Sequence, residues 1–147
     1  MNAKMSVDFL NGMKIVIIDD DANSLDVAKI LLEFSGADVR TANNGQEGLE
    51  VIQTFDPFLV LSDISMPKLD GWGLIKELRK SQRIATLVVI ALTAHAMVGD
   101  REKVMQAGFD GYLAKPLQPT TFISDLLRAI DTTRHIYTTK KIQKVQE

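Results

Sequence analysis

The sequence has 147 residues, of which 46% are hydrophobic and 24% are charged, so it has the size and composition of one folded domain and not of a disordered chain. It contains no cysteine, which excludes disulfide scaffolds, zinc sites with thiolate ligands and cysteine nucleophiles. The net charge of -2 disfavours a dedicated nucleic-acid binder, and no apolar run approaches the ~20 residues of a membrane span. Residues 1–12 lack the apolar segment of a secretory signal, so we expect a cytoplasmic protein.

The chain begins with a predicted strand, a helix and a second strand. Residues 14–18 are apolar and β-branched on both sides of the pleat, as expected for a strand that helices cover on two faces. Asn23 or Ser24 can cap the helix that follows, and Gly36 ends it. Residues 38–42 form a more polar strand, which we expect at an edge of the sheet.

The middle of the chain continues this alternation. Asn44-Gly45 opens a helix that runs to about Gln53. Pro57 precedes a strand over residues 58–61, which ends at Ser62-Asp63, and a loop leads to a helix over about 72–80.

The last third of the chain completes the pattern. A strand is predicted over residues 87–92, a helix over 98–107, a short strand over 111–114 and a final helix over 121–131. Strands that alternate with helices of about ten residues indicate βαβ units with right-handed crossovers. The predicted fold class is therefore α/β, with a parallel sheet between two layers of helices.

Polar side chains stand where four of the predicted strands end. In an open parallel sheet, ligands bind beyond the carboxyl ends of the strands. Carboxylates suit Mg²⁺, a lysine and a hydroxyl suit phosphoryl oxygens, and an aspartate beside a metal can accept a phosphoryl group. The pattern therefore indicates magnesium-assisted phosphoryl chemistry. The residues are Asp19-Asp20-Asp21, Asp63, Thr93 and Lys115.

Four motifs together resemble the receiver domain of the response regulators of two-component and phosphorelay signalling, such as the chemotaxis regulators. The resemblance covers roughly residues 13–131 and implies a flavodoxin-like, doubly wound sheet of five strands in the order 2-1-3-4-5, with five helices. The motifs are Ile17-Ile18-Asp19-Asp20-Asp21, Ser62-Asp63-Ile64-Ser65-Met66-Pro67 with Asp70-Gly71, Ala91-Leu92-Thr93-Ala94, and Tyr112-Leu113-Ala114-Lys115-Pro116.

The resemblance also implies a phosphoacceptor and a magnesium site. Asp63 would accept the phosphoryl group. Asp19 and Asp20 would form the acidic pair for Mg²⁺, with Asp20 a direct ligand alongside Asp63. The backbone carbonyl of Ser65 would complete the protein's share of the coordination.

The remaining signature residues imply a switch. Thr93 would turn toward the phosphoryl group, and the ring of Tyr112 would then move inward. Lys115 would pair with Asp63 before phosphorylation and with a phosphoryl oxygen afterwards, and Pro116 occupies the position of the family's cis-proline.

Each residue has a simpler structural interpretation when taken alone. Three acids after a strand also suit a solvated helix N-terminus, and Asp63 also suits a turn. We interpret Asp21 as a charge in the first helical turn and Trp72 as packing at the rim of the site. His95 has two interpretations, a solvent-facing loop residue or a residue that controls access of water, and His135 lacks the context of a phosphotransfer histidine.

The resulting hypothesis is a phosphorylation-dependent switch that catalyses its own phosphorylation and dephosphorylation. A histidine kinase or a histidine phosphotransfer domain would donate the phosphoryl group, and the surface of the fourth helix, fifth strand and fifth helix would bind a downstream protein. We expect a monomer or a phosphorylation-dependent dimer, with no direct nucleic-acid binding and no membrane insertion. The predicted domain spans residues 13–131, between an N-terminal extension (1–12) and a basic tail (132–147).

Three alternatives remain open from the sequence. The chain could be a receiver excised from a hybrid histidine kinase. A Mg²⁺-dependent phosphohydrolase with an aspartyl nucleophile is disfavoured, because Asp63-Ile64-Ser65 breaks the signature of that class. A flavodoxin-like FMN-binding protein is disfavoured, because three acids after the first strand would repel the phosphate.

Overall fold

The computed structural model describes residues 10–81, 84, 87–94 and 98–130 of the chain. The predicted N-terminal extension lies mostly outside these residues, and the basic tail, His95 and His135 lie outside them entirely. Nine elements alternate as predicted: β1 (Lys14–Ile18), α2 (Ala22–Phe34), β2 (Asp38–Ala42), α3 (Gly45–Phe55), β3 (Leu59–Asp63), α4 (Gly71–Lys80), β4 (Val88–Thr93), α5 (Val98–Ala107) and β5 (Gly111–Ala114). A further helix covers residues 122–130.

The five strands form one parallel sheet in the order β2-β1-β3-β4-β5, which confirms the predicted topology. The predicted edge position of the polar strand β2 is also confirmed. By contrast, all side chains of β3 and β4 are buried, because helices cover both faces of the central strands.

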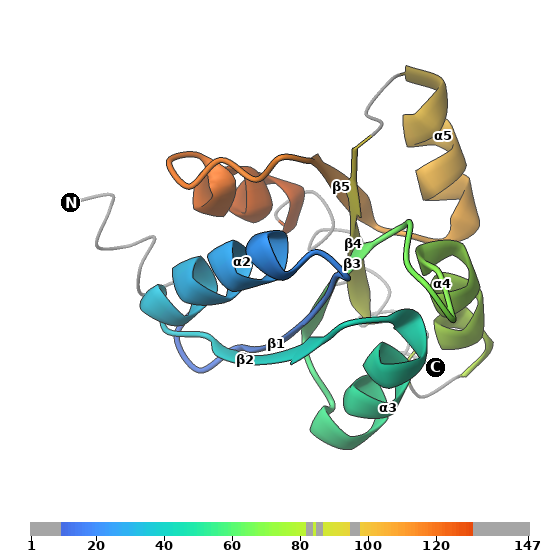
Figure 1. Cartoon of the computed structure of the whole chain (residues 1–147), viewed down its shortest axis with the longest axis horizontal. Helices are drawn as coiled ribbons and strands as arrows, with labels where there is room; N and C mark the ends of the chain where they lie inside the picture. Colours follow the sequence, from blue (N-terminus) through green and yellow to red (C-terminus); the bar gives the residue numbers. More distant parts are fainter. Residues whose placement is uncertain (1–9, 82–83, 85–86, 95–97, 131–147) are drawn as a thin grey trace, which may run out of the picture.

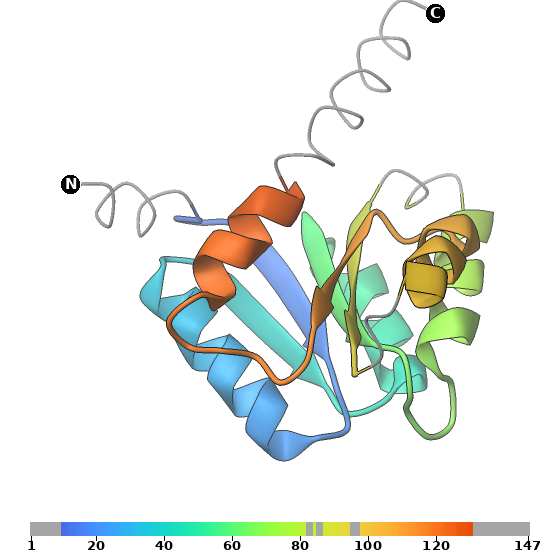
Figure 2. The ribbon, with the colours of Figure 1, turned by 90° about the horizontal axis from the view of Figure 1, so that it is seen from above.

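Helices cover both faces of the sheet (Figures 1 and 2), and an apolar layer lies under each set of helices. On one face, α2 and the helix over residues 122–130 pack on β1, β3 and β4 through side chains such as Leu32, Phe122 and Leu126. On the other face, α3, α4 and α5 pack on the same strands through Ile52, Leu74 and Val104. The predicted three-layer architecture is therefore confirmed. None of the helices in the described ranges is long and apolar enough to cross a membrane.

Some element ends differ from the prediction. The predicted cap of α2 at Asn23 or Ser24 is wrong: the cap is Asp21, two or three residues earlier, whose side chain accepts a hydrogen bond from the backbone N–H of Asn23. The predicted end of the second helix at Gln53 is two residues short, since α3 continues to Phe55 and Asp56 ends it in the left-handed conformation (φ 54°). Strand β3 includes Asp63, so the sheet, and not the loop that follows, fixes the position of this residue.

Candidate functional site

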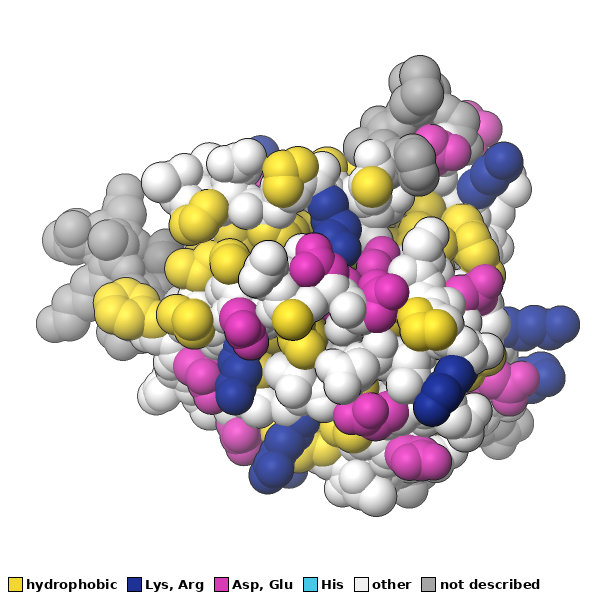
Figure 3. Space-filling view, viewed as in Figure 1, with side chains coloured by type: hydrophobic (Ala, Val, Ile, Leu, Met, Phe, Trp, Pro, Cys, Tyr) yellow, Lys and Arg dark blue, Asp and Glu magenta, His cyan; other side chains and the backbone are white. Residues whose placement is uncertain are grey.

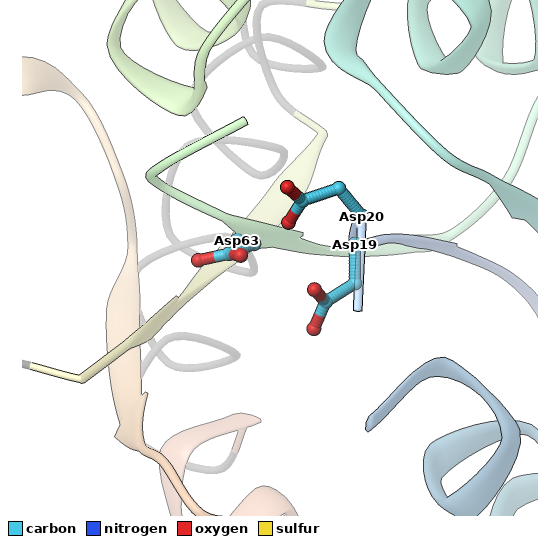
Figure 4. Close-up of side chains that lie close together, drawn as sticks. All are labelled: Asp19, Asp20 and Asp63. Carbon is cyan, nitrogen blue, oxygen red and sulfur yellow. The ribbon is translucent and has the colours of Figure 1, made fainter. Parts of the chain in front are cut away.

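Three acidic side chains meet at the carboxyl ends of β1 and β3. These strands are neighbours, with Ile18 level with Ser62, so the residues that follow them lie side by side. Each of Asp19, Asp20 and Asp63 offers a carboxylate oxygen, and these oxygens lie within 4.8 Å of one another (Figure 4). In the space-filling view, acidic side chains gather with a basic side chain at the middle of this face (Figure 3).

Asp19 and Asp21 point in different directions although they are two residues apart. Asp19 is buried, and its Oδ1 accepts a hydrogen bond of 2.9 Å from the backbone N–H of Asp21. The Asp21 carboxylate instead caps α2, accepting hydrogen bonds from the backbone N–H of Asn23 (3.1 Å) and from the Ser24 hydroxyl (3.0 Å). The Ser24 hydroxyl and the Asn23 amide lower the pKa of Asp21. Asp21 is thus the helix cap, and the acidic cluster does not include it.

The carboxyl group of Asp63 is held from several sides. It is buried, and its Oδ1 accepts a hydrogen bond of 2.7 Å from the backbone N–H of Ile64. The backbone N–H of Gly71 donates to the carbonyl of Ile64 (2.8 Å), which brings the start of α4 against the end of β3. A Cβ atom at position 71 would lie 2.7 Å from the carbonyl oxygen of Asp63, so only glycine permits this approach. The sequence analysis had named Gly71 as part of a motif with Asp70, without this steric role.

Lys115 supplies a positive charge to this acidic cluster. Its Nζ lies 3.0 Å from Asp19 Oδ2 and 3.4 Å from Asp63 Oδ2. Its backbone N–H donates to the carbonyl of Thr93 (2.8 Å), and the Lys115–Pro116 peptide bond is cis, as the resemblance implied. Burial lowers the pKa of Lys115, but the nearby carboxylates of Asp19 and Asp63 outweigh burial, so the pKa is raised overall. Lys115 therefore remains an ammonium group between the two carboxylates.

The electrostatics of the cluster favour an additional cation. Burial, and then the negative charge of Asp19, raise the pKa of Asp63 to about 6, while Lys115 acts in the opposite direction. Asp19 Oδ2 is buried, and within the described part of the chain its polar contact is the ammonium of Lys115 at 3.0 Å. Carboxylate oxygens in such a group are the ligands that Mg²⁺ prefers. The residues present therefore fit a magnesium ion.

Thr93 and Tyr112 lie on neighbouring strands at the same end of the sheet. Thr93 is buried at the end of β4 and lines a cavity of about 290 Å³ together with Asp63, Ser65 and Lys115. Tyr112 is half-buried in β5, level with Ala91, and packs against the apolar layer formed with α3, α4 and α5. The structure thus brings Asp19, Asp20, Asp63 and Lys115 into one cluster, and places Tyr112 outside it.

Apart from Trp72, the sequence pattern did not anticipate the far wall of this cavity. That wall includes Trp72 from α4 and Asp100, Lys103 and Val104 from α5. The predicted place of Trp72 at the rim of the site is consistent with this position, and its ring packs edge-on against Phe109 with centroids 6.2 Å apart. One feature of the sequence could have predicted this wall. Few residues separate Thr93, at the end of β4, from Val98, at the start of α5, so the first turns of α5 must lie near the end of β4.

Comparisons with known proteins agree with this architecture. The family described as "Response regulator receiver domain" matches residues 15–127. The "Polar-differentiation response regulator DivK" of Brucella anthropi is 32% identical over 112 residues, which are 76% of this chain and 91% of that protein. The "Probable transcriptional regulator ycf27" of Porphyridium aerugineum is 38% identical over 121 residues, which are 80% of this chain but only 49% of that protein. The chain therefore spans about half the length of the ycf27 relatives.

A solved structure shows the same fold. The chemotaxis response regulator CheY4 of Vibrio cholerae superposes with a TM-score of 0.76 at 25% identity, over 81% of this chain and 99% of that one. These matches favour the receiver interpretation over the phosphohydrolase and flavin-binding alternatives, and they apply equally to a receiver within a longer kinase. Because the family model matches residues 15–127, which are most of its length, the chain belongs to the response regulator receiver domain family.

Proposed function

We propose that Asp63 accepts a phosphoryl group from the phosphohistidine of a histidine kinase or a histidine phosphotransfer domain. The observation that carries this proposal is the position of Lys115 Nζ, 3.0 Å from Asp19 and 3.4 Å from Asp63, at the edge of a cluster of three carboxylates. A cluster of this kind provides an oxygen nucleophile, ligands for a divalent cation and a cation for the incoming phosphoryl group. Receiver domains in general bind Mg²⁺ and interact with kinases and effectors.

The transfer is a displacement at phosphorus. A carboxylate oxygen of Asp63 forms a bond to phosphorus while the bond from phosphorus to the donor's imidazole nitrogen breaks, and that nitrogen keeps the electron pair. The hydrogen bond from the Ile64 N–H to Asp63 Oδ1 orients the carboxylate for this step. Lys115 is close enough to exchange its contact with Asp63 for one with a phosphoryl oxygen.

The acidic residues of the cluster have separate roles in this proposal. Asp20, Asp63 and the backbone carbonyl of Ser65 would hold Mg²⁺, with Asp19 beside them. When bound, the ion offsets the negative charge that develops on the phosphoryl oxygens. Asp20 is exposed and Asp19 is buried, which supports Asp20 as the direct ligand that also reaches solvent.

We further propose that phosphorylation changes the surface of α5, β5 and the helix over residues 122–130. Thr93 would turn toward the phosphoryl group, and the ring of Tyr112 would occupy the space that it leaves. This surface would then bind a downstream protein in the cytoplasm, with the chain as a monomer or as a phosphorylation-dependent dimer. The proposed receiver domain spans residues 13–131.

The test is chemical phosphorylation followed by intact mass measurement. Acetyl phosphate or phosphoramidate with Mg²⁺ should add one phosphoryl group of ~80 Da to the wild type. The adduct should be absent from Asp63→Asn and present in Asp56→Asn, a matched control at an exposed aspartate whose left-handed backbone suits asparagine. An equal adduct in Asp63→Asn would assign the phosphoryl group to another residue, and no adduct in the wild type would contradict the proposal.

A further inference from the structure

The edge of the sheet at β2 has a pairing partner on one side only. β2 forms a parallel ladder with β1 over residues 38–42, and it is the first strand in the sheet order. Figure 1 shows this edge between α2 and α3. Within the described part of the chain, no other strand pairs with the outer side of β2.

The hydrogen bonds of the ladder identify the backbone groups that face outward. The N–H of Asp38 donates to the carbonyl of Met13 (2.9 Å), and the carbonyl of Ala42 accepts from the N–H of Asp19 (3.1 Å). Because successive residues of a strand alternate in direction, Asp38, Arg40 and Ala42 direct their backbone groups toward β1. Val39 and Thr41 therefore direct theirs away from the sheet, where an additional strand could bind them.

A cavity of about 600 Å³ lies along this edge. It is formed by one residue of α2, three consecutive residues of β2 and three residues of α3, and it shares none of them with the cavity beside Asp63. Both outward-facing residues of β2 are among them, so the cavity gives access to the edge. The residues are Lys29, Val39, Arg40, Thr41, Val51, Thr54 and Phe55.

The charge of this cavity is positive. Its two charged residues are Lys29 and Arg40, and no acidic residue lines it. The guanidinium of Arg40 lies 4.9 Å and the ammonium of Lys14 lies 5.3 Å from the centroid of the Phe55 ring, so one aromatic side chain holds two cations beside the edge. Asp38, level with Lys14 in the ladder, is the acidic residue of the strand itself and does not line the cavity, so the positive charge belongs to the cavity lining.

We propose that the β2 edge binds an extended, acidic segment of a partner protein as a sixth strand. The backbone of Val39 and Thr41 would supply the main-chain hydrogen bonds, as in other cases of strand addition. Arg40 and Lys29 would select acidic side chains on the incoming segment, and the half-buried Val51 and Phe55 would pack against its apolar ones. A second copy of this chain fits less well, because it would bring another Lys29 and Arg40 to the same cavity.

The test uses a fluorescein-labelled peptide of alternating glutamate and valine, with the full-length protein labelled with ¹⁵N. Fluorescence anisotropy should show saturable binding, and the amide signals of Val39 and Thr41 should shift. A peptide of alternating lysine and valine should bind at least about tenfold more weakly. Equal binding of the two peptides, or no shift at the β2 edge at millimolar concentrations of the acidic peptide, would overturn the proposal.

Two variants separate the backbone contribution from the charge. Thr41→Pro removes one outward-facing N–H while leaving the ladder with β1 intact, and it should abolish binding.

Arg40→Glu should weaken binding at least about tenfold. Lys76→Glu, the same charge reversal at an exposed position of α4, should leave binding unchanged. Equal losses in Arg40→Glu and Lys76→Glu would reject a local site. Sedimentation that shows dimers of the wild type but not of Thr41→Pro, without peptide binding, would assign the edge to a second copy.

Discussion

Asp63 combines burial, a hydrogen bond and two charged neighbours on a single carboxyl group. Burial and the negative charge of Asp19 oppose its ionisation, while Lys115 at 3.4 Å favours it. Together these effects raise the pKa of Asp63 to about 6. The folded protein therefore binds the carboxyl proton of Asp63 more tightly than the unfolded chain does, where the pKa is near 3.8. The ionised form of Asp63 is therefore a source of instability in the metal-free protein.

The raised pKa of Asp63 predicts that the effect of Asp63→Asn on the stability of the protein depends on pH. As the pH rises from about 4 to above 6, the wild type loses stability, because the native state must release a proton that the unfolded state has already lost. In EDTA at pH 7.5, Asp63→Asn should therefore raise the free energy of unfolding by about 1–2 kcal/mol, and at pH 4 it should have little effect. Urea unfolding at the two pH values measures both differences. A stabilisation of equal size at pH 4 would show that the charge of Asp63 is not its cause.

At the scale of elements, one arginine joins the ends of four neighbouring helices and strands. Arg79, in the last turn of α4, donates to the carbonyls of Gly108 (3.0 Å) and Leu87 (2.7 Å) and forms an ion pair with Asp110 (2.8 Å). Asp110 also accepts a hydrogen bond of 2.9 Å from the backbone N–H of Val89. The end of α4, the start of β4, the end of α5 and the start of β5 are thereby held together.

Removing this arginine should destabilise the protein more than removing a surface lysine. Arg79→Ala removes the ion pair with Asp110 and the arginine donor of two backbone carbonyls, which should cost about 2–3 kcal/mol. Lys80→Ala, the matched control one residue further along α4, breaks only the exposed pair with Glu77 and should cost less than about 0.5 kcal/mol. Chemical denaturation of both variants gives the comparison. Equal effects would mean that the Arg79 contacts are not maintained in solution.

The elements and the site were predictable to different degrees. Periodicity located β1, β3 and β4 because they are continuous apolar runs. It placed the cap of α2 at Asn23 or Ser24 and not at Asp21, because Asp, Asn and Ser are all competent helix caps. The cluster of Asp19, Asp20 and Asp63 followed from the strand ends, since parallel strands present those ends at one edge. The strand order came from the family resemblance. The Arg79–Asp110 pair could not be predicted, because 31 residues separate its partners and no local pattern relates them.

At the scale of the molecule, three strands contribute charged groups to one end of the sheet. Asp19 and Asp20 follow β1, Asp63 ends β3, and Lys115 follows β5. The net charge of -2 conceals this concentration of three carboxylates around one ammonium group. A cation bound there would link β1 to β3 and would reduce the repulsion between their carboxylates, so occupancy of the site should affect the stability of the whole fold.

This linkage predicts that Mg²⁺ stabilises the protein against heat. A ligand that binds only the folded state at ten times its Kd adds about 1.4 kcal/mol, enough to raise the Tm by several degrees in a domain of this size. Asp20→Asn should remove most of the increase, because it deletes one of the carboxylates in the cluster. Asp21→Asn should retain it, since Asp21 caps α2 and asparagine is an equally good cap.

Thermal unfolding with Mg²⁺, and with K⁺ at the same ionic strength, separates binding of the ion from screening of charge. An increase that persists in Asp20→Asn, or disappears in Asp21→Asn, would place the ion elsewhere than in the cluster.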